Sequence, residues 1–264
     1  MPHGRIQDRD VLISFQPIEQ VMGTEWQGHS GLELQAVHLW GIDLDGTSRC
    51  RERCAEWLDE EERHRAARLV REEDRQRYVL AHGGLRAVLS RYLGITPDAV
   101  ELRRSEAGKP FVTRKLRGQS VTFNMSHAHG RALIAVSMGQ EVGVDLERIR
   151  LEVEVEKLSE RYFACSEHAS IMQLTEAQRA PRFFRYWVAK EAVLKAQGIG
   201  LRALSQCEIL LGADGVYAEV LATEGSQLQD NWKVCALSCD EGWEAAVAAR
   251  GTGWVVQSGL NPHY

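Results

Sequence analysis

The chain alternates between segments with the two-residue period of a strand and segments with the longer period of a helix. Residues 34–44 alternate apolar and polar side chains, which predicts a strand. Residues 71–92 carry an apolar stripe at helical spacing and predict the longest helix. We expect Gly94 to end this helix, because glycine readily takes the left-handed conformation of a helix C-cap. Segments of both kinds are mixed along the sequence, which predicts the α+β fold class.

The patterns after residue 100 predict a closer succession of short elements. A polar loop over residues 126–130 is expected between two strands, and residues 138–141 predict a hairpin that leads into a strand carrying Asp145. The expected helices span residues 152–163, 166–174 and 181–197. Pro181 suits the first turn of the last helix, because proline lacks the N–H that a first turn leaves unbonded. The other expected strands are residues 102–105, 111–112, 121–124, 132–137, 207–211, 216–221, 232–237 and 244–249.

A short internal echo bears on the domain organisation. Residues 41–45 (Gly-Ile-Asp-Leu-Asp) resemble residues 143–147 (Gly-Val-Asp-Leu-Glu). A duplicated α+β unit would give this echo, although five such residues also recur by chance. We expect an N-terminal half over residues 33–138 and a C-terminal half over residues 139–264. Residues 1–32 show little periodicity and predict a loose N-terminal arm.

Composition and charge exclude some classes of function. The 264 residues are 44% hydrophobic and 26% charged, ordinary values for a globular protein, and the net charge of −5 argues against nonspecific nucleic-acid binding. No apolar run reaches the ~20 residues needed to cross a bilayer, which argues against a membrane protein. The first residues lack the hydrophobic core of a secretion signal, so we expect a cytoplasmic protein.

Two charged segments carry the most informative chemistry. Strand alternation places Asp145 and Glu147 on one side of their segment, and helical spacing places Glu191 and Lys195 on one face of a later segment. If that helix face lies over the strand end, three carboxylates and an ammonium converge. Such a set can hold a hard divalent cation against a phosphate and also transfer a proton. Taken singly, the same residues are typical of a solvated strand end and a surface ion pair.

Four motifs that follow one another in the chain carry a resemblance to a known family. They are Gly108-Lys109-Pro110, Asn124-Met125-Ser126-His127, Gly143-Val144-Asp145-x-Glu147 and Trp187-x-x-Lys190-Glu191-Ala192-x-x-Lys195. Together they resemble the signature of the 4′-phosphopantetheinyl transferases of the larger, Sfp-like (surfactin-synthetase-activating) type. The basic run Arg63-x-Arg65-x-x-Arg68 extends the resemblance, which covers residues 55–200.

The resemblance implies a fold and a reaction. The fold would be a pseudo-dimer of two similar α+β halves within one chain, with the ligand in the cleft between them and the protein a monomer. Such enzymes use Mg²⁺ to move the phosphopantetheine arm of coenzyme A onto a serine of an apo acyl or peptidyl carrier protein, and they release adenosine 3′,5′-bisphosphate. Coenzyme A and the apo carrier protein are therefore the expected partners, and nucleic acid and membrane are not.

The same resemblance assigns roles to individual residues. The expected magnesium ligands are Asp145, Glu147 and Glu191. Glu191, or a water that it orients, would take the proton of the incoming serine, and Lys195 would sit at the pyrophosphate and help the leaving phosphate to depart. The expected contacts to coenzyme A are Arg65, Lys109, Ser126, His127 and Lys195.

The sequence departs from the family pattern at two places and leaves rival functions open. Val188 stands where the family often has Ser, Thr or Cys, and Glu60-Glu61-Glu62 stands where it often has a further basic residue. The rivals are another Mg²⁺-dependent phosphoryl or nucleotidyl transferase and a noncatalytic carrier-docking module. The carrier, the general base and the choice between direct and water-mediated contact of Glu147 with the metal also stay open.

Overall fold

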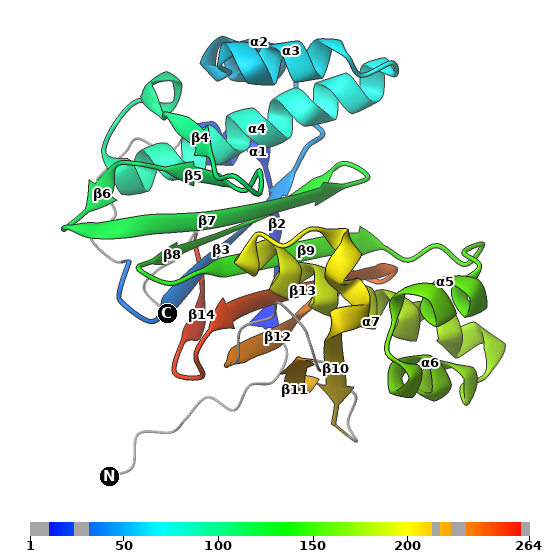
Figure 1. The fold of residues 1–264 in the computed structure, drawn as a ribbon. Coiled ribbons are helices and arrows are strands. Elements are labelled where there is room, and N and C mark those ends of the chain that lie inside the picture. Colours follow the sequence, from blue (N-terminus) through cyan, green and yellow to red (C-terminus); the bar gives the residue numbers. More distant parts are fainter. Residues whose placement is uncertain (1–10, 24–31, 213–216, 223–230, 260–264) are drawn as a thin grey trace. The chain divides into compact units, whose positions relative to one another are not determined.

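The computed structural model describes residues 11–23, 32–212, 217–222 and 231–259. The chain divides into two compact units. Of the described residues, those within 14–142 together with residues 253–259 form the N-terminal unit, and residues 11–13 together with those within 143–252 form the C-terminal unit. Each unit combines helices with β-sheet (Figure 1), so the expected α+β class is confirmed.

The two units do not follow the expected halves at the ends of the chain. β3 (Ala36–Asp43) pairs along one edge with two segments that are distant in sequence. β14 (Val255–Ser258) lies parallel to its first half and β2 (Phe15–Pro17) lies parallel to its second half. Of the expected loose arm, residues 1–10 and 24–31 lie outside the described residues, while β2 and α1 (Ile18–Gly23) are regular elements of the N-terminal unit.

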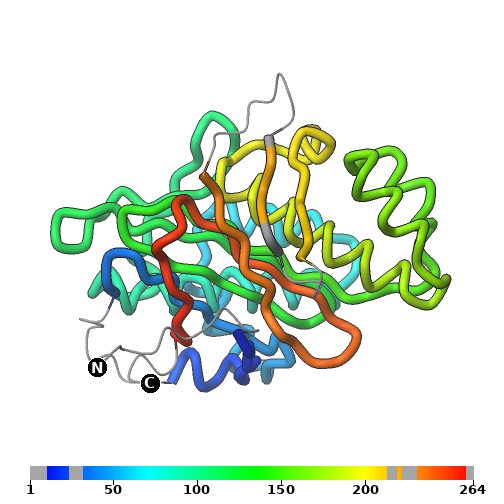
Figure 2. The backbone as a smooth tube through the Cα atoms, turned by 90° about the horizontal axis from the view of Figure 1, so that it is seen from below, coloured from blue at the N-terminus to red at the C-terminus, as the bar shows by residue number. Residues whose placement is uncertain are grey.

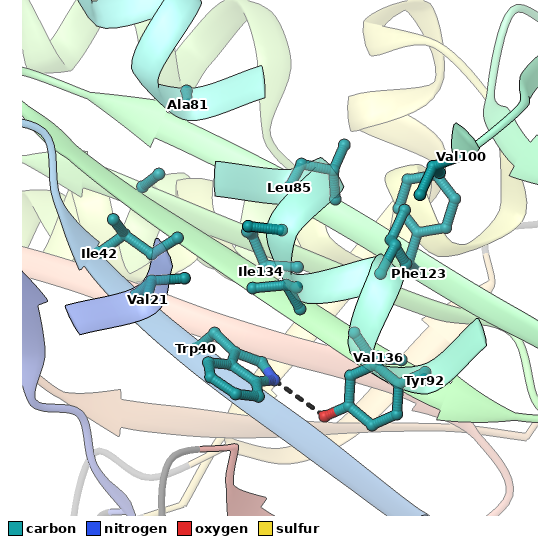
Figure 3. Close-up of a cluster of buried hydrophobic side chains, with 14 of the residues drawn as sticks. Val21, Trp40, Ile42, Ala81, Leu85, Tyr92, Val100, Phe123, Ile134 and Val136 are labelled. Atoms are coloured by element: carbon teal, nitrogen blue, oxygen red, sulfur yellow. Dashed lines mark hydrogen bonds between the residues drawn. The ribbon is translucent and has the colours of Figure 1, made fainter. Parts of the chain in front are cut away.

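The main sheet of the N-terminal unit has the strand order β14-β3-β8-β7-β6. β8 (Arg131–Met138) pairs antiparallel with both β3 and β7 (Gln119–Ala128), and β7 pairs with β6 (Lys115–Leu116). Apolar side chains at alternating strand positions, such as Ile42, Phe123 and Ile134, form one buried cluster with side chains of α4 (Figure 3). The other elements of this unit are α2 (Ser48–Trp57), α3 (Glu60–Ala67), α4 (Glu72–Leu93), η1 (Pro97–Ala99), β4 (Leu102–Arg104) and β5 (Pro110–Val112).

The long helix α4 is the predicted one and ends where predicted. Its first turn is acidic, which suits the positive end of the helix dipole, and Gly94 forms the C-cap with φ 63°. Near that end, the Tyr92 hydroxyl accepts a hydrogen bond from Trp40 Nε1 at 2.9 Å, which ties the helix to β3 inside the apolar cluster (Figure 3).

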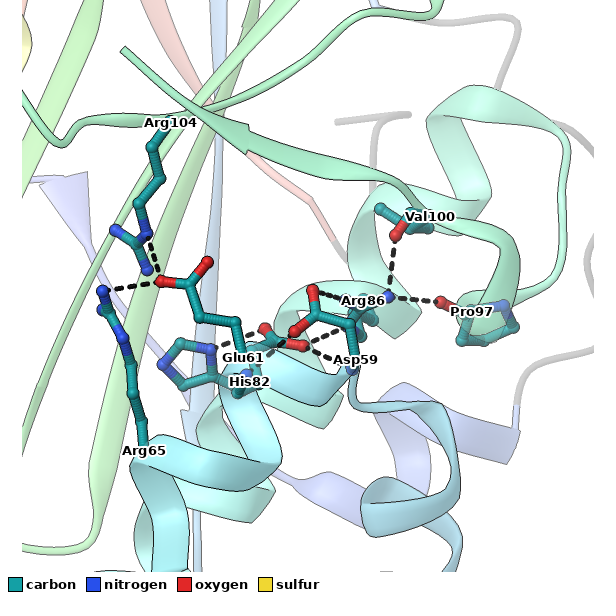
Figure 4. A network of polar contacts seen from close by, with 9 residues as sticks. Asp59, Glu61, Arg65, His82, Arg86, Pro97, Val100 and Arg104 are labelled. Carbon is teal, nitrogen blue, oxygen red and sulfur yellow. Dashed lines mark hydrogen bonds and ion pairs between the residues drawn. The ribbon is translucent and has the colours of Figure 1, made fainter. Parts of the chain in front are cut away.

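A buried polar network fastens α3 to α4 (Figure 4). Asp59 and Glu62 form a capping box at the start of α3. The Arg86 guanidinium, whose side chain is 1% exposed, donates to Glu62 Oε2 and to Asp59 Oδ2 at 2.7 Å each. It also donates to the carbonyl of Val100 at 2.7 Å. Because the buried Arg86 side chain bonds to the start of α3 and to the carbonyl of Val100, it holds three segments in one arrangement.

The predicted polar loop at residues 126–130 is wrong, because β7 continues through Ala128. The turn consists of His129 and Gly130 alone, with φ 43° and φ 88°. Positive φ at both central residues is the geometry that matches the twist of a two-residue hairpin, and it requires a residue such as glycine. Ser126 and His127 are therefore strand residues, opposite Leu133 and Ala132 of β8.

The C-terminal unit is built on a sheet with the strand order β1-β12-β13-β9. β12 and β13 run side by side as an antiparallel pair, orange to red in Figures 1 and 2, and α7 packs on β13. A separate pair, β10 with β11, follows the long helix. The elements are β1 (Val11–Leu12), β9 (Val142–Arg148), α5 (Val155–Tyr162), α6 (Cys165–Met172), α7 (Glu176–Gln197), η2 (Leu201–Gln206), β10 (Cys207–Leu211), β11 (Tyr217–Ala222), β12 (Trp232–Ser238) and β13 (Trp243–Arg250).

Two expectations for this unit are corrected. The strand that carries Asp145, β9, pairs with β13 and not with the preceding strand, so the hairpin predicted at residues 138–141 is wrong. Residues 139–141, between β8 and β9, connect two sheets. α7 begins at Glu176, where Gln178 Oε1 accepts a hydrogen bond from the backbone N–H of the N-cap residue Thr175 at 3.3 Å, and Pro181 lies inside the helix. Gly198 ends α7 as expected, with φ 72°. Among the described residues, no helix is long and apolar enough to cross a membrane.

The polar network around Arg86 predicts a pH-dependent stability. Burial acts to raise the Glu62 pKa, but the hydrogen bond of His82 and the charges of Arg86 and His82 outweigh it and hold the pKa below its usual range. A carboxyl with a lowered folded pKa stabilises the fold above its unfolded pKa of about 4.3 and loses that contribution as pH falls through the folded value.

Glu62→Gln should therefore lower the free energy of unfolding by about 2 kcal/mol at pH 7, because the neutral amide carries no charge to balance the buried Arg86 guanidinium. The difference from the wild type should shrink as pH is lowered from 5 toward 2. Urea unfolding at a series of pH values measures it. A difference that is the same at every pH would contradict the pairing.

Candidate active site

A close contact between β9 and α7 places the charged residues of the C-terminal unit. A Cβ atom added to Gly143 would lie 2.0 Å from the carbonyl oxygen of Ala192 and 2.4 Å from the nitrogen of Ala196. Only a residue without a side chain allows strand backbone to approach helix backbone so closely. Strand alternation then turns Asp145 and Glu147 to the same side as Gly143, which is the side of α7.

Asp145 and Lys195 meet at this contact. Lys195 Nζ donates to Asp145 Oδ1 at 2.6 Å. The Asp145 side chain is 5% exposed and that of Lys195 is 30% exposed, so the ammonium lies at the border between the buried carboxylate and solvent. The expected convergence of these two residues is therefore present.

Glu191 and Glu147 belong to the same electrostatic neighbourhood. Burial raises the Glu191 pKa to about 7, with a further rise from the charges of Asp145 and Glu147 that Lys195 opposes. Burial and the charge of Asp145 also raise the Glu147 pKa, while Arg150 and Lys195 oppose the rise. Glu191 is thus a carboxyl whose pKa is raised toward neutral pH, which favours a general base.

The carboxylates offer oxygen ligands of the kind that magnesium takes, and their mutual repulsion is what a bound cation would relieve. Among the described residues, no three His, Cys, Asp or Glu side chains stand together as a group that could hold a metal ion. Asp145 is paired with the Lys195 ammonium. The donor chemistry therefore fits magnesium, and the assignment of Asp145, Glu147 and Glu191 as its ligands stays a prediction.

A cavity of about 300 Å³ in the C-terminal unit is lined in part by Glu147. Its wall shares Glu147 and Arg150 with the charged site, and the Arg150 guanidinium lies over the ring of Phe184 at 5.4 Å. The remaining lining is Val153, Glu154, Leu158, Phe183 and Trp187. Trp187 packs edge-to-face on Tyr162, so the predicted packing role of this residue is present, although the side chain is only partly buried.

The predicted basic residues of the N-terminal unit are found in ion pairs. Arg65 NH2 lies 2.8 Å from Glu61 Oε1, and Arg104 Nε lies 3.0 Å from the same oxygen (Figure 4). Arg104 also donates to the carbonyl of Gly108 at 3.0 Å, next to Lys109. Arg104 therefore links the Arg65 ion pair to the loop that carries Lys109. The sequence did not single out Arg104, because it is simply the second of two adjacent arginines before that loop.

Ser126 and His127 lie side by side near the end of β7. As neighbours in β7 they point to opposite faces of the sheet. Ser126 is buried at 8% exposure, whereas His127 is exposed at the end of the strand. The assignment of both residues as contacts of coenzyme A stays a prediction.

Comparisons with known proteins decide the family. The chain is 36% identical over 220 residues to the 4′-phosphopantetheinyl transferase HetI of Nostoc sp., a match that covers 83% of this chain and 89% of the relative. The chain belongs to the 4′-phosphopantetheinyl transferase superfamily. The family model of that superfamily matches residues 141–248, and a model of a 4′-phosphopantetheinyl transferase N-terminal region matches residues 47–140.

Two further likenesses are more distant. This transferase-family chain is 26% identical over 220 residues to the 4′-phosphopantetheinyl transferase Sfp of Bacillus subtilis, which covers 81% of this chain and 92% of the relative. A solved holo-(acyl-carrier-protein) synthase of Bacillus anthracis in complex with coenzyme A gives a TM-score of 0.36 at 18% identity, over 42% of this chain and 96% of that one, too weak a likeness to argue from.

The lysine of the transferase helix motif, Lys190, has a role that sequence reasoning missed. Its side chain is fully buried, and Nζ donates to Glu167 Oε2 and to the carbonyl of Cys207. Glu167 accepts from the backbone N–H of Ile209 at 2.8 Å and of Ala164 at 2.7 Å. This buried hub joins α6, α7 and β10, so it fixes the rotation of α7 and with it the direction of the next residue, Glu191.

The contact at Gly143 predicts that an alanine at this position lowers stability, whereas an alanine at Gly200 does not. Gly143→Ala must push β9 away from α7, so we expect unfolding to become easier by about 3 kcal/mol or more and the transferase site to lose its geometry. Gly200→Ala is the matched control in the same unit, because a Cβ at Gly200 meets nothing within 4 Å. Thermal unfolding of both variants checks this. Equal stabilities would contradict the contact.

The buried hub predicts a coupled pair of substitutions. Lys190→Met leaves the buried Glu167 carboxylate without its counter-charge, which should cost about 3–5 kcal/mol of unfolding free energy. Adding Glu167→Gln should recover part of that loss, because a neutral amide needs no counter-charge and still accepts a backbone hydrogen bond. Denaturant unfolding of the two single variants and the double variant measures the coupling. Strictly additive losses would show that the two residues do not interact.

Proposed function

We propose that this protein transfers the 4′-phosphopantetheine arm of coenzyme A to a serine of an apo acyl or peptidyl carrier protein, with Mg²⁺, and releases adenosine 3′,5′-bisphosphate. The observation that carries the proposal is the meeting of Asp145 with Lys195, beside Glu191, in a chain of this family. Buried acids beside an ammonium suit a reaction whose main demands are charge neutralisation and positioning.

The C-terminal unit supplies groups for each part of the chemistry. The serine oxygen attacks the phosphorus that bears pantetheine, and the bond from that phosphorus to the bridging oxygen breaks, so that the nucleotide leaves. Glu191, directly or through a water, accepts the serine proton, for which a pKa near 7 is suited. Lys195, released from Asp145, donates to the pyrophosphate and to the leaving oxygen. Asp145, Glu147 and Glu191 would hold Mg²⁺, which supplies charge neutralisation at the pyrophosphate.

The N-terminal unit supplies candidate contacts for the phosphates of coenzyme A. Arg65 and Arg104 converge on one carboxylate oxygen, and a phosphate oxygen is the ligand that such a guanidinium pair suits best. Lys109 is held on the adjoining loop. The exposed His127 is a further candidate contact to a phosphate of coenzyme A. The buried Ser126 stays a predicted contact to the same ligand.

The cavity beside Glu147 is a candidate contact surface for the carrier protein. A carrier serine that reaches Glu191 brings the surrounding carrier surface over the adjoining wall. That wall is largely apolar, with Phe183, Phe184 and Trp187 in its lining. We therefore assign the cavity to an apolar side chain of the carrier protein, next to the modified serine.

Replacement of Asp145 or Glu191 by alanine should abolish transfer, with a loss of at least about a hundredfold in rate, because each removes a metal ligand or the general base. Glu160→Ala, an exposed acid on α5, is the control. The measurement incubates each protein with coenzyme A, Mg²⁺ and apo acyl, peptidyl or aryl carriers and weighs the carriers by mass spectrometry.

The expected result for wild type and Glu160→Ala is a gain of one phosphopantetheine unit. Full activity of Asp145→Ala or Glu191→Ala would refute the site. No gain on any carrier with the wild type would refute the function, and phosphate or nucleotide release without carrier modification would identify a different phosphoryl transferase.

A further inference from the structure

The cations that we assign to coenzyme A are already paired with carboxylates of the N-terminal unit. Glu61 Oε1 accepts from both Arg65, at 2.8 Å, and Arg104, at 3.0 Å (Figure 4). Lys109 forms a short ion pair with Glu141. Glu61 and Glu141 are neither proposed metal ligands nor proposed phosphate contacts. The proposed reaction therefore does not explain why they pair with these cations.

These ion pairs lie together on one part of the unit. Arg104 joins the Glu61 pair to the loop between β4 and β5 by its bond to the Gly108 carbonyl, at 3.0 Å. In that loop Lys109 N donates to Ser105 Oγ at 3.1 Å and Ser105 N donates to the Lys109 carbonyl at 2.9 Å. These two bonds close the backbone of the loop between Ser105 and Lys109, next to the Gly108 carbonyl that Arg104 contacts.

We propose that Glu61 and Glu141 are displaceable counter-ions that set the affinity for coenzyme A: each carboxylate holds its cations in the free protein, and a ligand phosphate replaces it. The proposal rests on the proposed function. Two guanidinium groups that meet on one oxygen mark the place of an anion, and here the chain's own carboxylate fills that place.

The exposure of the acids makes the exchange possible. The Glu61 and Glu141 side chains are 58% and 53% exposed, so either can rotate into solvent. Ion pairs of such exposed groups add little to stability, and a phosphate group brings more charge to the same cations than a carboxylate does. After displacement each acid stays tethered nearby and repels the bound phosphate, so it lowers affinity in both states.

The opposite role makes the opposite prediction. If Glu61 and Glu141 served to position the cations for the ligand, their removal would weaken binding, because disordered arginine and lysine side chains lose more entropy on binding. The sign of the change in affinity therefore separates a competing counter-ion from a positioning residue.

The test is isothermal titration of coenzyme A into four variants of the full chain and the wild type. Glu61→Gln and Glu141→Gln each remove one acid that contacts a cation. Glu60→Gln, from the same first turn of α3, and Glu101→Gln, from an exposed position before β4, remove the same charge elsewhere and serve as matched controls. Thermal unfolding of each variant confirms that it is folded.

We expect Glu61→Gln and Glu141→Gln each to bind coenzyme A about fivefold more tightly than its control, the size of one unit-charge repulsion at about 4 Å in water. The gain should shrink as salt is raised, because exposed charges are screened. Titration of dephospho-coenzyme A, which lacks the 3′-phosphate, shows which phosphate each acid competes with. If an acid competes with the 3′-phosphate, its Gln variant should bind dephospho-coenzyme A no more tightly than the control does.

Affinities equal to or weaker than those of the controls would overturn the proposal while leaving the function intact. A wild type that does not bind coenzyme A at all would instead overturn the proposed function, and the inference with it. A transfer assay on an apo carrier, run in parallel, separates these results, because tighter binding should lower KM and leave kcat of the same variants unchanged.

Discussion

The contact between the backbone of β9 and the backbone of α7 is the constraint on which the C-terminal unit depends. Because Gly143 has no Cβ, the strand lies directly on the helix between Ala192 and Ala196. The strand period then sets the side to which Asp145 points, and the helix period sets the side to which Glu191 and Lys195 point. The chemistry of the site follows from this contact, since it turns residues that are 46 and 50 positions apart in the chain into neighbours.

Charged side chains serve two different purposes in this protein, and burial separates them. The pairs Lys190–Glu167 and Arg86–Glu62 are almost entirely buried and tied to backbone groups, so they fix helices in place. The pairs Lys195–Asp145, Arg65–Glu61 and Lys109–Glu141 each keep one partner at least partly exposed. A charge held in this way is ordered before a ligand arrives and can still exchange its partner, which is what binding of a phosphate requires.

Much of the fold and of the site was predictable because it depends on local sequence patterns. The long helix ending at Gly94 and the helix ending at Gly198 have a clear period and a glycine cap, and the structure has both. The order of the Asp145 and Glu191 motifs indicated the family that the comparisons show. Period and spacing gave the side of the strand that carries Asp145 and the face of the helix that carries Lys195, and the structure shows that the two meet.

The features that sequence reasoning missed depend on contacts between distant segments. The parallel strand β14 and the pairing of β9 with β13 leave no local period. β7 extends through Ala128 because the turn is only two residues long, and the polar residues 126–130 gave no sign of this in the sequence. As strand residues, Ser126 and His127 point to opposite faces of the sheet. The role of Lys190 depends on Glu167 and on a carbonyl of β10, which no motif links to it.

The most direct measurement of the central claim is the anomalous scattering of Mn²⁺ in a crystal grown with coenzyme A, since Mn²⁺ takes the same oxygen ligands as Mg²⁺. The account predicts one strong peak about 2.1 Å from carboxylate oxygens of Asp145 and Glu191, with the diphosphate of coenzyme A bound to the same ion and Lys195 turned from Asp145 to the phosphate. A peak at other residues, or a diphosphate bound far from Asp145 and Glu191, would contradict it.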